Sequence, residues 1–276
     1  MMALIKVDFF SQSLMRTVTI QAILPVDKIL EVGEELPSPK PFKTLYLLHG
    51  IFGNDMDWVS GTRIQRWAQD YNVAVIMPAG ENKFYVDNER SHEYYSRFIG
   101  EELVDMTRRL FPLSHQREDT FIAGLSMGGY GAIVNGLKYH QTFGYIAGLS
   151  SALILNMIVK SKDGDNIPYM NKRSYLESVF GPIDQLIGSD KDYKALIEQI
   201  SQKDIPHIYM ACGSEDFLLK ENRDYVKYLK AHHIAVTYEE GPGGHEWDFW
   251  DKYILKVLEW LPLTDKKEGL SSGHVQ

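Results

Sequence analysis

One short pattern in this chain of 276 residues could support nucleophilic chemistry: Gly124, Ser126 and Gly128 form Gly-x-Ser-x-Gly. Glycines two positions either side of a serine remove Cβ clashes, so the serine can occupy a sharp turn from strand to helix. Such a turn exposes the hydroxyl at the amino terminus of the next helix, where developing negative charge is stabilised. The apolar run at 120–123 and the helical stretch at 130–139 provide these flanks. The alternative is a glycine-rich turn with an incidental serine.

A serine nucleophile needs a base to take its proton and an acid to orient that base. Both candidates follow Ser126 along the chain in the order that this type of turn requires. Asp216 comes shortly after an apolar run at 207–211, and His245 comes after another at 234–238. Because catalytic groups gather at the carboxyl ends of parallel strands, we expect the three side chains to lie together.

The acid and the base each have alternatives in the sequence. Asp216 could serve only as the cap of the helix that follows it, and Glu215 could be the acid instead. His245 could be an exposed loop residue. Its rivals, His232 and His233, are predicted at a helix end before a strand, which is the wrong edge of the sheet.

Two backbone N–H groups should stabilise the oxyanion that forms when serine attacks a carbonyl. Met127 directly follows the serine and is expected to donate one of them. The other should come from the loop that contains Gly50 and Gly53, whose glycines allow the backbone to curl towards the substrate. Ile51 is the preferred donor in this loop and Phe52 is the second choice. The alternative is an ordinary glycine turn after a strand.

The remaining histidines and the single cysteine give no sign of a metal site. Four histidines lack metal-ligand spacing, and Cys212 has no second thiol to share a zinc ion. The expectation is therefore no metal and no cofactor, with Cys212 as a buried core residue. The four histidines are His92, His115, His140 and His274.

Charge and hydrophobicity exclude several classes of partner. The chain has 29 basic and 37 acidic side chains, a net charge of −8, which disfavours binding to nucleic acids or anionic membranes. It has no run of 18 apolar residues to cross a membrane, and its first residues lack the apolar core of a secretory signal. A single cysteine fits a reducing compartment, so a cytoplasmic location is predicted.

Short apolar runs alternate with helical stretches and are the elements that must position these residues. After two β-rich segments at 5–10 and 16–24, the runs lie at 44–48, 73–77, 120–123, 145–149, 207–211 and 234–238. Runs of this kind are typical of strands buried on both faces of a mostly parallel sheet. The alternation predicts a three-layer α/β fold with helices on both faces.

The domain prediction is a single unit over residues 1–262, with two irregular regions and a tail. Residues 31–41 are rich in acids and prolines and are expected to form an exposed connection. Residues 153–204 separate two core strands and are predicted to form a small cap over the active face, with a helix near 193–200. Residues 263–276 are expected to be a flexible tail.

The chain resembles the esterase D-like branch of the α/β-hydrolase family, and it is most similar to small bacterial tributyrin esterases. The segments that carry this resemblance are residues 46–50, 57–58, 121–131, 212–218 and 244–247, and together they span about residues 3–262. The resemblance implies an α/β-hydrolase fold and a carboxylesterase in which Ser126 is the nucleophile, His245 the base and Asp216 the acid. It also implies that the Ile51 N–H is the second oxyanion donor.

The resemblance implies ester substrates with a short acyl group, acetyl to butyryl. The acyl donor is either a small ester or a sugar with an O-acetyl group. The resemblance leaves open whether the protein forms a homo-oligomer. Two related activities are alternatives. A thioesterase like S-formylglutathione hydrolase often has a cysteine near the loop of His49 and Gly50, which this chain lacks. A feruloyl or cinnamoyl esterase would need a pocket lined by aromatic side chains. The candidate substrate-binding residues are Phe52, Trp58, Tyr95 and Trp247.

Two readings outside the esterases are weaker. A serine peptidase of this fold usually carries a large extra domain, for which 276 residues leave no room. A binding module without activity would not be expected to keep a complete and ordered set of serine, aspartate and histidine.

Overall fold

The computed structural model describes residues 3–27 and 40–263. The exposed connection predicted at 31–41 lies outside these ranges except for its last two residues. The predicted tail lies outside them except for Leu263. None of the helices in the described ranges is long and apolar enough to cross a membrane.

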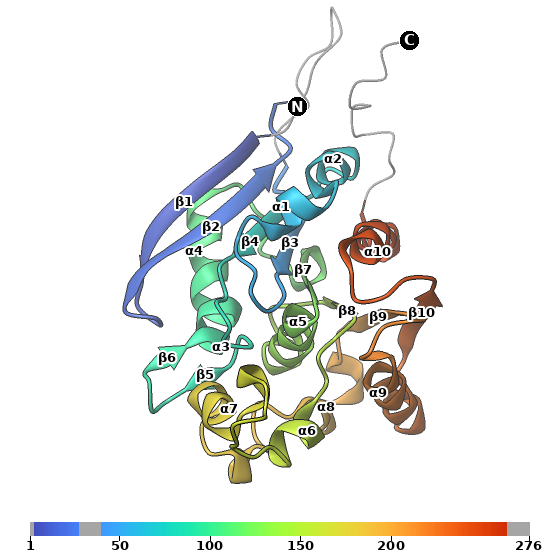
Figure 1. Cartoon of the computed structure of the whole chain (residues 1–276). Helices are drawn as coiled ribbons and strands as arrows, with labels where there is room; N and C mark the ends of the chain where they lie inside the picture. Colours follow the sequence, from blue (N-terminus) through green and yellow to red (C-terminus); the bar gives the residue numbers. More distant parts are fainter. Residues whose placement is uncertain (1–2, 28–39, 264–276) are drawn as a thin grey trace, which may run out of the picture.

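An eight-stranded sheet forms the central layer (Figure 1), in the order β1-β2-β4-β3-β7-β8-β9-β10. β1 (Ala3–Ser11) and β2 (Arg16–Leu24) form an antiparallel hairpin, and β2 is also antiparallel to β4. All other neighbours are parallel: β3 (Thr44–Leu48), β4 (Ala74–Pro78), β7 (Thr120–Leu125), β8 (Tyr145–Leu149), β9 (His207–Gly213) and β10 (Val236–Gly241).

The register brings the carboxyl ends of the central strands to one edge of the sheet. Leu48 of β3 lies opposite Gly124 of β7, and Leu149 of β8 lies opposite both Leu125 of β7 and Ala211 of β9. The loops that follow these strands must therefore meet. This is the edge at which open α/β sheets bind their ligands.

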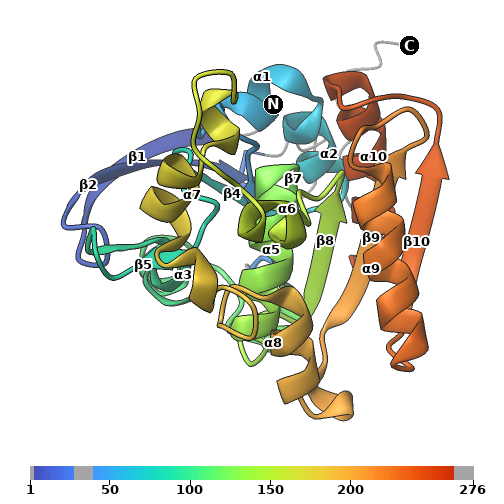
Figure 2. The ribbon, with the colours of Figure 1, turned by 60° about the horizontal axis from the view of Figure 1, so that its bottom comes forward.

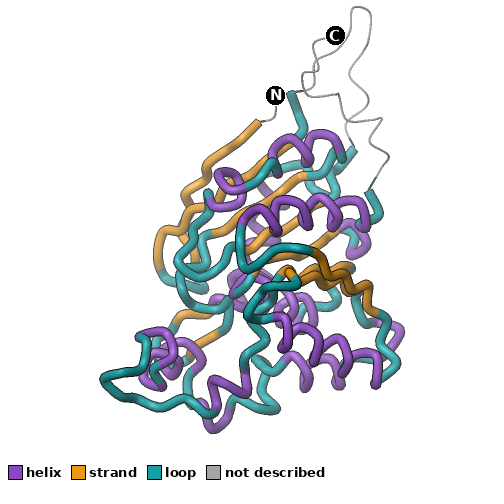
Figure 3. The backbone as a smooth tube through the Cα atoms, turned by 45° about the vertical axis from the view of Figure 1, so that its right-hand side comes forward, coloured by secondary structure: helices purple, strands orange, loops and turns teal. Residues whose placement is uncertain are grey.

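Helices cover both faces of the sheet, so the predicted mostly parallel α/β architecture is confirmed (Figures 1 and 3). One face carries α1 (Asp57–Gly61), α2 (Ile64–Asp70) and α10 (Trp247–Trp260). The other carries α3 (Tyr95–Arg97), a π-helical turn (Phe98–Glu102), α4 (Leu103–Leu110), α5 (Met127–Lys138) and α9 (Leu219–Ala231). A two-stranded sheet of β5 (Asp87–Asn88) and β6 (Glu93–Tyr94) lies apart from the main one.

The segment between β8 and β9 contains three short α-helices, α6 (Leu155–Val159), α7 (Arg173–Phe180) and α8 (Tyr193–Gln199), visible in Figure 2. Its apolar side chains join the same buried cluster as α5 and α9. The Tyr130 hydroxyl of α5 donates to the Lys191 carbonyl at 2.6 Å, and the Phe180 ring of α7 packs on Tyr130. The segment is thus packed against the core of the domain, beside the edge where the strand ends meet.

Candidate active site

Ser126 occupies the turn between β7 and α5 with an unusual backbone conformation, φ 53° and ψ −117°. A positive φ is uncommon for a residue with a side chain, and such strain persists only where surrounding contacts impose it. Here the Ser126 N–H donates to the Leu149 carbonyl at 2.9 Å. The Ser126 carbonyl accepts from the N–H groups of Tyr130 at 3.0 Å and Ala152 at 2.9 Å. Three main-chain hydrogen bonds therefore fix the turn.

The two glycines of the motif are required by close backbone approach. A Cβ atom on Gly124 would lie 2.3 Å from the Gly128 carbonyl oxygen, and one on Gly128 would lie 2.4 Å from the Leu48 carbonyl oxygen. Backbone atoms packed between the strand ends and the start of α5 cannot move aside for a methyl group. The spacing predicted from the sequence thus has a direct steric cause in the fold.

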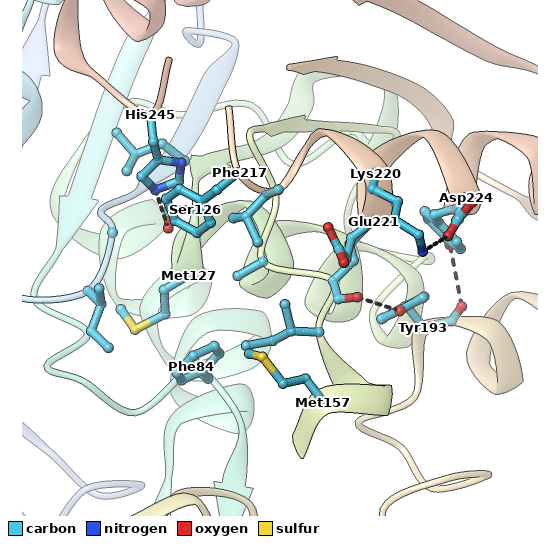
Figure 4. A pocket seen from close by; sticks show the side chains of 18 of the residues that line it. Phe84, Ser126, Met127, Met157, Tyr193, Phe217, Lys220, Glu221, Asp224 and His245 are labelled. Carbon is cyan, nitrogen blue, oxygen red and sulfur yellow. Dashed lines mark hydrogen bonds and ion pairs between the residues drawn. The ribbon is translucent and has the colours of Figure 1, made fainter. Parts of the chain in front are cut away.

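The structure brings Ser126, His245 and Asp216 into one hydrogen-bonded chain (Figure 4 draws the first two). Ser126 Oγ lies 2.9 Å from His245 Nε2, and His245 Nδ1 lies 2.9 Å from Asp216 Oδ2. Burial works to raise the pKa of Asp216, but hydrogen bonds from His245, the Leu218 N–H and Ser150 outweigh it and hold that pKa below its usual value. As a carboxylate, Asp216 accepts a hydrogen bond from His245 Nδ1–H, so Nε2 carries no proton and can accept the one from Ser126.

The alternative acid and bases lie elsewhere. The carboxylate of Glu215 is exposed and accepts the Gly243 N–H at 3.1 Å. His232 and His233 follow the carboxyl end of α9. The roles of helix cap and of catalytic acid are compatible for Asp216. Its carboxylate accepts one hydrogen bond from the Leu218 N–H, just before α9, at 2.8 Å and another from the imidazole of His245.

Two aromatic rings hold the imidazole of His245 in place. The Phe217 ring lies 4.6 Å from it and the Trp250 ring lies 4.9 Å from it at 89°. Trp250 Nε1 in turn donates to Ser150 Oγ at 3.2 Å, which ties α10 to the strand end behind the site. Ser150 was not among the predicted site residues, although its hydroxyl hydrogen-bonds to Asp216 and accepts from Trp250.

The loop after β3 contains both candidates for the second oxyanion donor, Ile51 and Phe52. The Phe52 N–H is occupied, because it donates to Asn82 Oδ1 at 2.7 Å. Within the described part of the chain, the N–H groups of Ile51 and Met127 donate to no acceptor. An oxyanion hole requires two such unoccupied donors. This geometry favours Ile51 over Phe52 as the partner of Met127.

His49 is a buried residue of this loop whose role the sequence analysis did not identify. Its Nε2 accepts the Gly80 N–H at 2.8 Å, so the ring proton must be on Nδ1, which donates to the Gly50 carbonyl at 2.6 Å. Burial lowers the pKa of His49 and keeps the ring neutral. The Gly50 carbonyl and the Ile51 N–H belong to one peptide unit, so this bond also orients that N–H. The adjacent residues His49 and Gly50 are the sequence pattern that could have indicated this role.

The segment after β4 supports the loop after β3 through hydrogen bonds. Besides the bonds from Gly80 and Asn82, the Tyr85 hydroxyl donates to the His49 carbonyl at 3.0 Å. This segment is itself fixed, because Asn135 of α5 donates to the Tyr85 carbonyl at 3.0 Å. Tyr175 of α7 donates to the Asn82 carbonyl, also at 3.0 Å.

A cleft of about 1450 Å³ opens over Ser126, and two of the four predicted substrate-binding residues line it. These are Phe52, whose side chain is 72% exposed, and Trp247 at the start of α10. Residues from α6, α8 and α9 complete the walls. A volume of this size exceeds the space that an acetyl or butyryl group would occupy.

The other two predicted substrate-binding residues, Trp58 and Tyr95, do not line the cleft. Trp58 is 1% exposed; its indole donates to the Leu48 carbonyl at 3.0 Å and packs edge-on against Trp247. Tyr95 is fully buried and accepts a hydrogen bond from Arg16 of the hairpin. Both expectations are corrected here: these aromatic rings fill the interior between helix and sheet, which composition alone could not distinguish from a pocket wall.

The single cysteine, Cys212, is buried and is not among the residues that line the cleft. Burial, with the nearby charge of Asp216, raises the pKa of the Cys212 thiol to about 12, so it stays protonated. Among residues 3–27 and 40–263, no three histidine, cysteine or acidic side chains are grouped so that they could hold a metal ion.

Comparison with known proteins assigns the family. Residues 11–261 match the family described as "Putative esterase". An acetyl esterase of Caldicellulosiruptor saccharolyticus is 49% identical over 262 residues, which are 94% of this chain and 98% of that protein.

Two solved structures from Staphylococcus aureus are each 30% identical to this chain. They are fluorophosphonate-binding serine hydrolase F (TM-score 0.81; 94% of this chain and 98% of that one) and the S-formylglutathione hydrolase FrmB (0.80; 95% and 99%). The chain therefore belongs to this esterase family of α/β-hydrolases and is a carboxylic ester hydrolase.

Proposed function

We propose that this protein is a serine carboxylesterase that hydrolyses short-chain acyl esters through an acyl-enzyme. The observation that carries the proposal is the hydrogen-bonded chain from Ser126 through His245 to Asp216, which ends at the floor of the cleft. A serine hydroxyl gains nucleophilicity only where a base can take its proton, and His245 is in position to be that base.

In the proposed mechanism, Ser126 Oγ bonds to the ester carbonyl carbon while its proton passes to His245 Nε2. The oxyanion then accepts hydrogen bonds from the Ile51 and Met127 N–H groups. Collapse of this intermediate breaks the bond to the alcohol oxygen, which takes the proton from His245 and leaves. Water repeats the sequence with His245 as base, so the acid is released and the serine regains its proton.

Acetyl to butyryl esters are the proposed acyl range. The acetyl esterase at 49% identity supports this choice, because that name specifies a two-carbon acyl group. The alcohol could belong to a small ester or to an O-acetylated sugar. A cytoplasmic location and a homo-oligomeric state remain predictions.

Side-by-side hydrolysis of p-nitrophenyl acetate and butyrate by the wild type and by Ser126→Ala tests the nucleophile. We expect kcat to fall by roughly 10³-fold or more in the variant. A variant that keeps most of its activity would refute the assignment. A wild type that is inactive on both esters would favour a binding module or a very selective enzyme.

Esters of two to twelve acyl carbons test the chain length. The proposal expects the highest kcat/KM at two to four carbons, and a maximum at eight or more would refute it. Methyl ferulate and S-formylglutathione belong in the same series, because feruloyl esterase and thioesterase activities are the alternatives. The 30% identity to FrmB supports the thioesterase, whereas the absence of cysteine from the loop of His49 and Gly50 disfavours it.

A further inference from the structure

β1 lies at one edge of the main sheet and has a neighbouring strand on one side only (Figure 1). Within the described residues, no strand pairs with its outer side. β1 pairs with β2 along its whole length without a bulge, so its outer side is a regular strand edge. Such an edge can pair with a strand of another chain unless charges, bulges or a covering element prevent it.

The pairing of β2 with its two neighbours shows which backbone groups of β1 face outwards. Along a strand between two antiparallel neighbours, residues alternate in the neighbour to which they hydrogen-bond. The Ala79 N–H donates to the Thr19 carbonyl at 3.3 Å, so the odd-numbered residues of β2 bond towards β4 and the even-numbered ones towards β1. Ile20 lies opposite Val7, so the odd-numbered residues of β1 bond to β2. The even-numbered residues direct their N–H and C=O groups outwards, and they are Leu4, Lys6, Asp8 and Phe10.

We propose that two copies of this chain associate through β1, with the two strands antiparallel about a two-fold axis at Val7. This association joins the two eight-stranded sheets into one continuous sheet. Both copies contribute the same surface, as in most symmetric dimers. Residues at equal distances from Val7 lie opposite each other. The resulting pairs between copies are Leu4 with Phe10, Ile5 with Phe9, and Lys6 with Asp8.

Charge complementarity is the observation that carries this proposal. Lys6 and Asp8 are exposed on the same face of β1 and form an ion pair at 3.5 Å within one copy. In the proposed pairing, each Lys6 ammonium also lies opposite Asp8 of the second copy, so four charges of alternating sign come together. Opposite charges in a direct cross-strand pair are stabilising, whereas like charges there are destabilising.

This register satisfies the backbone hydrogen bonds and the charges together. A shift by one residue places the outward groups of one strand opposite residues of the other that already bond to β2, so no regular ladder forms. The next permitted registers are centred on Lys6 or on Asp8. Each of these brings two like charges into a direct pair, and each also places a charged side chain opposite Leu4 or Phe10.

The apolar side chains of β1 fit the same register. Leu4 is 38% exposed and Phe10 is 54% exposed, although both are large and apolar. The pairing places them against each other at both ends of the strand pair. On the other face of β1, Ile5, Val7 and Phe9 are only partly buried against the core, and the second copy covers part of their remaining surface.

β10, at the other edge of the sheet, lacks these properties. Its residues include two acids and no base. Glu239 already forms an ion pair with Lys256 of α10, and Glu240 forms one with Arg223 of α9. A second copy of β10 offers no opposite charge to these acids, so the proposal concerns β1 alone.

Sedimentation of the full chain at several concentrations tests the association. We expect the wild type to form a dimer that dissociates on dilution. Lys6→Glu and Asp8→Lys each create two pairs of like charge and should raise the dissociation constant about tenfold or more. Lys230→Glu is the matched control, because it makes the same change of net charge at an exposed position of α9. It should leave the dissociation constant unchanged.

Charge exchange provides a sharper test than loss of the dimer. The double variant Lys6→Glu/Asp8→Lys has opposite charges in both pairs again, so it should associate like the wild type. An equimolar mixture of the two single variants should form a mixed dimer for the same reason. Failure of both restorations, after loss in the single variants, would overturn the pairing of Lys6 with Asp8.

Oxidative cross-linking tests the register itself. At the two-fold axis, Val7 lies opposite its own copy in a pair without hydrogen bonds, where Cα atoms are about 4.5 Å apart. This separation is within the range of a disulfide, so Val7→Cys should give a cross-linked dimer. Ile5→Cys is on the same face but lies opposite Phe9, so it should not cross-link. The native Cys212 is buried and does not interfere.

The variants should remain folded and active, because three strands separate β1 from β7, which leads to Ser126. Circular dichroism and p-nitrophenyl acetate hydrolysis check this for each variant. A wild type that stays monomeric at every concentration would overturn the proposal. So would a dimer that both charge reversals leave intact and that Val7→Cys does not cross-link, since the copies would then meet at another surface.

Discussion

The turn at residues 124–128 and the segment at 153–204 both border the cleft, but they are built in different ways. In the turn, main-chain hydrogen bonds hold the backbone of Ser126, and Gly124 and Gly128 lie where backbone atoms leave no room for a Cβ. In the segment, short helices pack through side chains on α5 and on the loop after β4. The conformation of the proposed nucleophile thus depends on backbone geometry, whereas the wall that the segment adds to the cleft consists of side chains that can be exchanged.

The largest expected effect concerns the acid of the triad. Asp216→Asn should lower kcat by about 10⁴-fold, because an amide can no longer fix the histidine tautomer. The neighbouring Glu215→Gln is the control and should change kcat less than about twofold, since its carboxylate does not contact His245. Equal losses in both variants would contradict the assignment of the acid. Steady-state kinetics with p-nitrophenyl acetate measure the difference.

The pH profile of the wild type tests the same chain of residues. The pKa of Asp216 is held below its usual value, so this group stays ionised throughout the working range and contributes no limb to the profile. A rate that depends on a neutral histidine base should therefore rise only once as the pH increases. A profile that stays flat as the pH increases would argue against a histidine base.

A methyl group added to each of the two regions tests the comparison directly. Gly128→Ala places a Cβ 2.4 Å from the Leu48 carbonyl oxygen, so we expect kcat to fall about 100-fold or more and the free energy of unfolding to fall by about 1–3 kcal/mol. Gly164→Ala, in the other region, places its Cβ 3.4 Å from the nearest atom and should change both quantities little. Chemical denaturation and steady-state kinetics on both variants measure these changes. Similar losses in the two variants would contradict the difference between the turn and the segment.

Asn82 connects the loop after β3 with α7 of the segment at 153–204, and its substitution should have an intermediate effect. Asn82→Ala removes the acceptor of the Phe52 N–H, which should loosen the oxyanion loop and lower kcat about tenfold with little change in KM. Asn82→Asp keeps an acceptor at this position and should restore most of the activity. If both variants lose the same activity, the hydrogen bond to Phe52 does not position the loop.

The smallest effect is expected for Tyr175→Phe in α7. It removes one hydrogen bond to the Asn82 carbonyl, which should cost about 0.5–1.5 kcal/mol of unfolding free energy and change kcat less than twofold. Thermal unfolding and kinetics measure both. A loss of kcat as large as that of Asn82→Ala would mean that α7 controls the oxyanion loop.

Strand positions were predictable because a strand that is buried on both faces has a continuous run of apolar residues in its sequence. The run at 44–48 coincides with β3, which is fully buried. The prediction was poorer for β10, where the apolar run at 234–238 ends before the strand does (Val236–Gly241). β10 is an edge strand that pairs only with β9, so its partly exposed faces accept Glu239 and Glu240, and the apolar signal fades.

The sequence by itself determined the turn around Ser126 and the order of serine, acid and base, because these follow from steric limits and from strand ends that the chain encodes locally. Only the tertiary structure decided that Trp247 borders the cleft while Trp58 is buried beneath it. The same holds for His49, whose contact with Gly80 joins residues 31 positions apart. Residue types indicate what a side chain can do, but the direction in which it points depends on distant elements that pack against it.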